Sequence, residues 1–238
     1  MTLEGTDTWV LASPGARWAV VVDPGPDDAA HGAAVLQHLE QRGLRCALVL
    51  TTHHHHDHAD GVPGLVAATG SPRVLLAQDA RDGEVLEVDG LRLLLLRTPG
   101  HTADSVCALV EGERSLLTGD TVLGRGSTVL APGGDLASYL ASLRRLLALD
   151  DAEPLGALLP GHGPARTDAR AALEVQLEHR LQRLEQVRAA VGAGAVDVDA
   201  VVSAVHGLPR EALRGTLADA ARLSVRAQLA HLGVELPG

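Results

Sequence analysis

The sequence contains no lysine and no phenylalanine, and its only aromatic residues are Trp9, Trp18 and Tyr139. So few aromatic side chains exclude a base-stacking platform for single-stranded nucleic acid. No apolar run approaches the roughly 20 residues of a membrane span. The first residues also lack the basic and apolar regions of a secretory signal, so we expect a cytoplasmic protein that does not associate with membranes.

Cysteine is equally scarce, and the balance of charge is acidic. Cys46 and Cys107 each lie within an apolar run and show no CxxC spacing, which predicts two buried thiols. The formal net charge of −10 disfavours attraction to nucleic acid, and we expect no DNA partner. The 238 residues are 46% hydrophobic, which is enough for one large domain or for a domain with an appendage.

The pattern of apolar residues divides the chain near residue 167. The first part alternates expected strands with helices, which predicts an α/β domain over 1–166. Its strands are expected at 8–11, 17–22, 46–50, 74–77, 84–88, 91–97, 106–110, 115–118 and 157–159. Its helices are expected at 27–41, 61–69 and 136–149. The remainder, 167–238, shows only helical periodicity, with later helices at 198–205 and 210–231.

Histidine is abundant, with 12 in the chain and five of them between residues 53 and 58. The cluster fits the pattern H-x-H-x-D-H through His53, His55, Asp57 and His58. Side chains two positions apart in an extended segment point the same way, so His53 and His55 can hold one metal ion. If the chain then turns, Asp57 and His58 can face a second ion. These ligands suit zinc, and also iron or manganese.

The two remaining histidines of the run, His54 and His56, point away from the expected ligands. We expect them to be solvent-exposed or to support the ligands. A single loop cannot complete two metal sites, so further ligands must come from elsewhere. The candidates His101, Asp120 and His162 each follow an apolar strand directly. The number of residues from His58 to His101 is nearly equal to the number from Asp120 to His162. This spacing suits two structural halves that contribute ligands from the same edge.

Together the motifs THHHHDHADG (52–61), PGHT (99–102), TGDT (118–121) and PGHG (160–163) resemble those of the metallo-β-lactamase-fold hydrolase superfamily. The resemblance implies an αββα sandwich with two divalent metal ions, most simply Zn²⁺, at one edge. It implies two ligand sets and one bridging ligand. These are His53, His55 and His101 for the first ion, Asp57, His58 and His162 for the second, and Asp120 between them.

Within the superfamily, the metal motifs resemble the glyoxalase II group, and the segments 119–126 and 159–164 resemble the beta-lactamase-like protein 2 group. The helical C-terminal region is similar to the winged-helix-like domain of the latter. A true β-lactamase is disfavoured, because Gly119 precedes the bridging carboxylate, the commonest subclass has a cysteine near its site, and no export signal is visible.

The activity implied is hydrolysis by a metal-bridging hydroxide that Asp57, the expected catalytic residue, would orient. We expect a small acyl substrate of the thioester or ester type. The alternative, implied by the second group, is a single-strand-specific endoribonuclease, so RNA stays open as a partner. No further cofactor is expected, and the chain could be a monomer or a homodimer.

Several polar residues outside the metal motifs have two interpretations. Tyr139 could line the pocket, but we favour a packed position on its helix. Ser127 and Thr128, after a Gly-rich turn, are weaker candidates for the site. The arginines on the first helix of the C-terminal region could contact phosphates, but a solvated face is favoured there because the helix is rich in glutamate. These are Arg180, Arg183 and Arg188.

Overall fold

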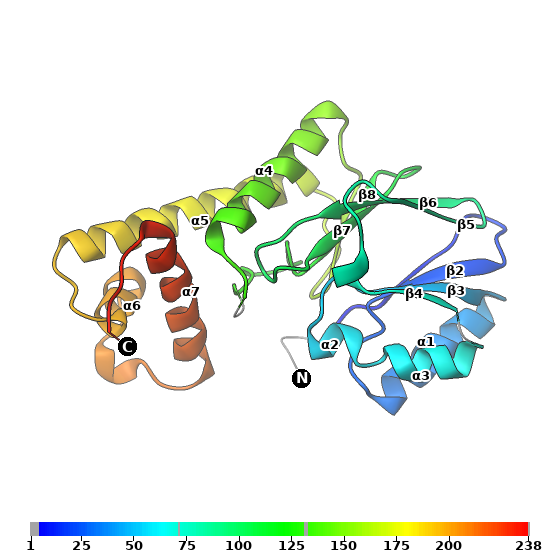
Figure 1. Ribbon diagram of the computed structural model, residues 1–238, viewed down its shortest axis with the longest axis horizontal. Helices are drawn as coiled ribbons and strands as arrows, with labels where there is room; N and C mark the ends of the chain where they lie inside the picture. Colours follow the sequence, from blue (N-terminus) through cyan, green and yellow to red (C-terminus); the bar gives the residue numbers. More distant parts are fainter. Residues whose placement is uncertain (1–4, 71, 131–132, 238) are drawn as a thin grey trace.

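The computed structural model describes residues 5–70, 72–130 and 133–237. Two β-sheets lie face to face, with helices on their outer faces and a helical region at one side (Figure 1). The first sheet has the order β1 (Trp9–Leu11), β2 (Trp18–Val22), β3 (Arg45–Leu50) and β4 (Arg73–Leu75). The second has the order β5 (Val85–Val88), β6 (Leu91–Arg97), β7 (Val106–Val110), β8 (Ser115–Gly119) and β9 (Leu158–Pro160). The expected α/β sandwich is confirmed.

Alternating side chains explain how each sheet buries both faces. In β2, Val20 and Val22 face the second sheet, whereas Ala19 and Val21 face the helices outside. In β3 the pairing with β2 shifts by one residue at Ala47. The shift reverses the alternation locally. Cys46 therefore faces the helices, whereas Leu48, two residues later, faces the second sheet.

Helices cover the two outer faces of the sandwich. Helices α1 (Ala29–Gln41) and α3 (Val62–Thr69) pack on the first sheet. Helix α4 (Leu136–Ala152) covers the second sheet, and α5 (Ala169–Gly192) packs alongside α4 (Figure 1). This arrangement places the beginning of the C-terminal region in the same apolar core as the second sheet.

The helical C-terminal region expected from the sequence is present. Beyond the body, α5 packs against α6 (Val198–His206) and α7 (Thr216–Leu232) around a core of their own. The helix expected at 210–231 is broken, because Gly215 adopts a φ of 78° between the short 3₁₀ turn Arg210–Ala212 and α7. No helix in the described part of the chain has both the length and the hydropathy needed to cross a membrane.

The beginning of the chain lies along the end of β9. The indole Nε1 of Trp9 donates to the carbonyl of Pro160 at 2.9 Å, and the amide of Asp7 donates to the carbonyl of Gly161 at 2.8 Å. These bonds join the first sheet to the last strand of the second. They close the sandwich at the edge where the histidine motifs lie.

Candidate metal centre

Four strands end at this edge, and each leads into one of the histidine or aspartate motifs. In the second sheet β6, β8 and β9 run in the same direction, so their carboxyl ends meet. His101, Asp120 and His162 follow these ends within a few residues. In the first sheet β3 leads into the histidine run, and the Thr52 carbonyl accepts the amide of Val106 at 2.8 Å. That bond joins the segment after β3 in the first sheet to the beginning of β7 in the second.

The first group consists of His53, His55 and His101. His55 Nδ1 lies 3.0 Å from His53 Nε2 and 3.1 Å from His101 Nε2. His53 and His101 are buried, and His55 is partly exposed. Three ring nitrogens therefore converge from two loops, as the alternation in the histidine run predicts.

The second group forms because the chain turns after His55 into a one-turn helix, α2 (His56–Ala59). This turn brings Asp57 and His58 toward His162. The Nε2 atoms of His58 and His162 lie 3.3 Å apart, and Asp57 Oδ2 lies 3.4 Å from His162 Nε2. The structure thus brings together the second set of residues as well.

Asp120 lies between the two groups. Its Oδ1 is 3.5 Å from His58 Nε2, and its Oδ2 is 3.6 Å from His101 Nε2 and 3.5 Å from His162 Nε2. All seven residues expected to be ligands therefore gather in one cluster. The cluster contains three groups of three residues, and within each group the potential ligand atoms lie within 4.8 Å of one another. Gly161 makes room for this cluster, since a Cβ there would lie 2.6 Å from the His58 ring and 2.7 Å from Asp120 Oδ1.

The outer nitrogens of three rings are held by oxygen acceptors. His58 Nδ1 donates to Asp23 Oδ2 at 2.8 Å, His101 Nδ1 to the Val129 carbonyl at 2.6 Å, and His162 Nδ1 to the Gly5 carbonyl at 2.7 Å. Each acceptor holds a proton on Nδ1 and turns Nε2 toward the cluster. Metal-binding histidines are oriented in the same way.

The electrostatics of the cluster favour an ionised carboxylate among imidazoles. Burial tends to raise the pKa of Asp120, but its hydrogen bond with His162 and the charge of His58 hold it well below the usual range. Burial opposes protonation of His162, yet Asp120 outweighs it and raises the pKa of His162 to about 9. Burial and the neighbouring His101 lower the pKa of His55 to about 4.

Two carboxylate oxygens show that the cluster fits a metal ion. Asp57 Oδ2 and Asp120 Oδ1 are buried, and neither has a hydrogen-bond partner among the described residues. Buried carboxylates are costly unless a cation or a donor compensates them. Imidazole nitrogens and carboxylate oxygens are the donors that zinc, iron and manganese accept. The residues present therefore fit a divalent metal.

Asp23 supports the cluster and is not among the predicted site residues. It is buried at the end of β2 with a φ of 51°. Its Oδ1 accepts the amide of Thr52 and its Oδ2 accepts the Thr52 hydroxyl, both at 2.7 Å, in addition to His58. The Asp-Pro-Gly sequence at 23–25 indicated only a turn. An acid directly after four buried strand residues was the signal that could have identified it.

The remaining histidines of the run lie outside the cluster. His54 bonds Asp104 at 2.8 Å, and His56 lies 3.1 Å from Asp60 with its side chain 94% exposed. The expectation that they are exposed or support the site agrees with these contacts. The favoured packed position of Tyr139 is also confirmed, because its ring is fully buried.

The expected solvated face of α5 is wrong for Arg180. This side chain is only 2% exposed, and its guanidinium contacts the Thr128 carbonyl and the Tyr139 ring. Arg183 is partly buried against the Val205 carbonyl, whereas Arg188 is exposed and pairs with Glu185. Helical periodicity alone could not show which face of α5 packs against a loop some 50 residues earlier.

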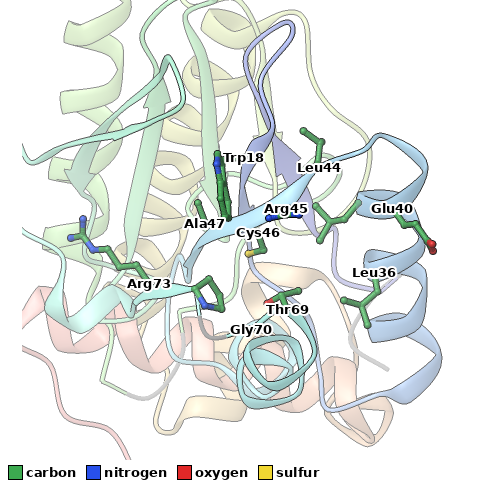
Figure 2. A pocket seen from close by; sticks show the side chains of 12 residues that line it. Trp18, Leu36, Glu40, Leu44, Arg45, Cys46, Ala47, Thr69, Gly70 and Arg73 are labelled. Atoms are coloured by element: carbon green, nitrogen blue, oxygen red, sulfur yellow. The ribbon is translucent and has the colours of Figure 1, made fainter.

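A cavity of about 550 Å³ opens beside the cluster. It is lined by Gly5, Thr6, Pro26, Asp27, Asp28, His55, His56 and Asp57. A second cavity, of about 850 Å³, lies where β3 begins, at the opposite end of that strand from the histidine run (Figure 2). Trp18 and Arg45 form part of its wall (Figure 2). Of these two cavities, the first is the one that residues of the cluster line, through His55 and Asp57.

Comparison with known proteins identifies the family. The family model of the metallo-beta-lactamase superfamily matches residues 75–162. An atrochrysone carboxyl ACP thioesterase of Aspergillus chevalieri is 33% identical over 221 residues, which cover 86% of this chain and 69% of the relative. The chain belongs to the metallo-beta-lactamase superfamily. The lactamase-like protein adaB of Aspergillus niger is 37% identical over 199 residues, 80% of this chain and 60% of that protein. This superfamily member spans about 60% of the length of the first curated relatives it matches.

Solved structures of the superfamily share this architecture. A beta-lactamase domain protein from Burkholderia ambifaria superposes with a TM-score of 0.77 at 22% identity, covering 98% of this chain and 84% of that one. This likeness extends over the helical C-terminal region and shows the fold. TTHA1623, solved in a di-iron-bound form, superposes with a TM-score of 0.57 at 27% identity, covering 74% of this chain and 92% of that one.

Proposed function

We propose that this chain is a dinuclear metal-dependent hydrolase that cleaves a small acyl thioester. The observation that carries the proposal is the pair of three-residue groups with Asp120 between them. A structural zinc site is usually closed and rich in cysteine, whereas this cluster contains only histidine and aspartate and lies beside a cavity. That donor set and position favour catalysis.

The ligand assignment follows the two groups. His53, His55 and His101 would hold one ion; Asp57, His58 and His162 would hold the other; and Asp120 would contact both. Bound divalent cations would supply Lewis acidity and lower the pKa of water at the site to about 7. Zinc suits this donor set, and the di-iron form of TTHA1623 makes iron an equal candidate to test.

Asp57 is the residue of the cluster best placed to act on a substrate. It lines the 550 Å³ cavity, and its side chain remains 22% exposed while Oδ2 lies in the cluster. Its carboxylate can orient a water molecule toward a carbonyl carbon in the cavity and accept the proton that the water loses. The same group can then return this proton to the departing thiolate. Asp57 is therefore the catalytic residue we propose.

A thioester is favoured over other acyl bonds by the relatives. The proteins of Aspergillus chevalieri and Aspergillus fumigatus that align with this chain are both named atrochrysone carboxyl ACP thioesterase. A thioester of a small acyl group is thus the substrate class we assign. The arginines of α5 that could contact phosphates give the endoribonuclease alternative no support, because Arg180 is buried, Arg183 is partly buried and Arg188 is paired with a glutamate.

The test combines metal content with a substrate panel. Untagged protein is analysed for zinc, iron and manganese and assayed on acyl thioesters, oxygen esters, a β-lactam and single-stranded RNA. We expect about two ions per chain and thioester cleavage that a chelator abolishes and added metal restores. Cleavage of RNA without cleavage of any thioester would replace this proposal with the endoribonuclease.

A further inference from the structure

A loop of irregular structure, residues 121–130, supports two members of the cluster from outside. The Val129 carbonyl accepts His101 Nδ1 at 2.6 Å. The Thr128 hydroxyl donates to the Asp120 carbonyl at 2.8 Å. Consecutive residues of this loop thus orient the ring of one expected ligand and the backbone of another. Any displacement of Thr128 and Val129 would move both.

The two ends of this loop are held from α4 and α5. The hydroxyl of Tyr139, on α4, donates to the Thr121 carbonyl at 2.7 Å and accepts Gln176 Nε2 at 2.9 Å. One turn further along α5, the guanidinium of Arg180 donates to the Thr128 carbonyl and lies 5.1 Å from the centre of the Tyr139 ring. A buried polar network therefore joins the C-terminal region to the loop.

Arg180 is an unusual residue for this position. It is 2% exposed, its Nε has no hydrogen-bond partner among the described residues, and no carboxylate in that part of the chain pairs with it. A buried charge without a counter-ion destabilises a fold, and an apolar side chain of similar size is often neutral or stabilising there. Packing alone therefore does not account for an arginine at this position.

We propose that Arg180 is a positioning residue of the metal centre, acting through the Thr128 carbonyl on His101 and Asp120. This inference rests on the metal centre proposed above. The planar guanidinium can bond the carbonyl while its face lies against the Tyr139 ring, an arrangement for which lysine is a poor substitute. The C-terminal helical region thereby contributes to metal binding without supplying a ligand.

The experiment measures Co²⁺ binding to the metal-free full-length chain by visible absorption, with competition by a chelator to obtain both affinities. The decisive variant is Arg180→Met, which keeps the volume of the side chain and removes its hydrogen bond and charge. We expect a melting temperature equal to or above that of the wild type, with affinity for one of the two ions about tenfold to a hundredfold weaker. Arg180→Lys should recover part of the loss.

The matched control is Arg188→Ala on the same helix, which removes an exposed arginine that pairs with Glu185 and not with the loop. It should leave Co²⁺ affinity unchanged. Unchanged affinity in a folded Arg180→Met protein, or equal losses in both variants, would overturn the positioning role. Wild-type protein that binds Co²⁺ without cleaving any thioester would count against the proposed substrate and leave the affinity comparison intact. Wild-type protein that binds no Co²⁺ would overturn both proposals.

Discussion

The two groups of the metal centre are supported from different parts of the molecule. In the group of Asp57, His58 and His162, the outer ring nitrogens bond Asp23, which follows β2, and Gly5, which precedes β1. In the other group, His101 depends on a loop that α5 holds through Arg180. His53 of that group contacts the Thr52 hydroxyl, which bonds Asp23, so His101 is the member of the candidate centre whose support comes from the C-terminal region.

The largest effect should come from removing His58, which is buried and contacts both His162 and Asp120. His58→Ala should lower kcat/KM by about 10³-fold or more, because several kcal/mol of transition-state stabilisation depend on an intact site. The measurement is kcat/KM on the cleaved thioester together with metal content. The matched control is His38→Ala, which changes an exposed histidine in the last turn of α1 that does not line the cavity beside the cluster. Similar losses in both variants would contradict the assignment of His58.

A smaller effect is expected from Asp23→Asn, which tests the support that Asp23 gives to His58 in the group of Asp57, His58 and His162. Asp23 accepts three hydrogen bonds, and an amide nitrogen in place of one oxygen cannot accept from Thr52 or His58. We expect metal affinity to fall by about tenfold to a hundredfold. Chelator competition would measure it, in parallel with Arg180→Met.

The control for that variant is Asp89→Asn. Asp89 is another aspartate with positive φ, and its carboxylate also accepts backbone amides, from Arg17 and Trp18, but it lies in a hairpin away from the cluster. Both substitutions keep a residue that tolerates positive φ. Equal changes in metal affinity would show that the loss in Asp23→Asn is not specific to the site.

The smallest effect concerns the two thiols, which report on the two halves of the sandwich. Burial raises the pKa of Cys107 to about 11, so about a thousandth of it is thiolate at pH 8. Cys107 bonds Thr98, which in turn bonds Thr121 of the supporting loop. We expect very slow alkylation of Cys107 in the wild type, followed residue by residue with mass spectrometry. Arg180→Met should accelerate the alkylation of Cys107 more than the alkylation of Cys46. Equal acceleration at both cysteines would indicate that the substitution destabilises the whole fold.

Local patterns sufficed for most of the sandwich and for the members of the cluster. Strands β6 and β7 have the predicted bounds, because Leu91–Arg97 and Val106–Val110 are apolar runs bordered by turns. The histidine and aspartate motifs follow strand ends, where topology brings them together. The expected strand at 74–77 instead ends at Leu75, because Ala77 begins a 3₁₀ turn whose amide bonds the Thr51 hydroxyl.

The rest depends on contacts between distant segments. Helix α2 is one turn long and lies inside a histidine run, so no periodicity could indicate it. Arg180 and the exposed Arg188 both lie in a glutamate-rich stretch of α5, so the local sequence does not distinguish them. Their burial differs because the loop at Thr128 packs against Arg180. The role of Asp23 likewise follows from its distance to His58 across the sheet. The division at residues 166 and 167 and the roles of the seven cluster residues stay predictions.

The hydrogen bond from His162 to the Gly5 carbonyl, with those that join Asp7 and Trp9 to Gly161 and Pro160, has a consequence for biosynthesis. Residues 5–9 are synthesised early, yet their partners at 160–162 are added only some 150 residues later. Until then the nascent chain has the histidine run without the strand that completes it. His53, His55 and His101 are therefore all made before the group of Asp57, His58 and His162 is complete, because that group waits for the segment after β9.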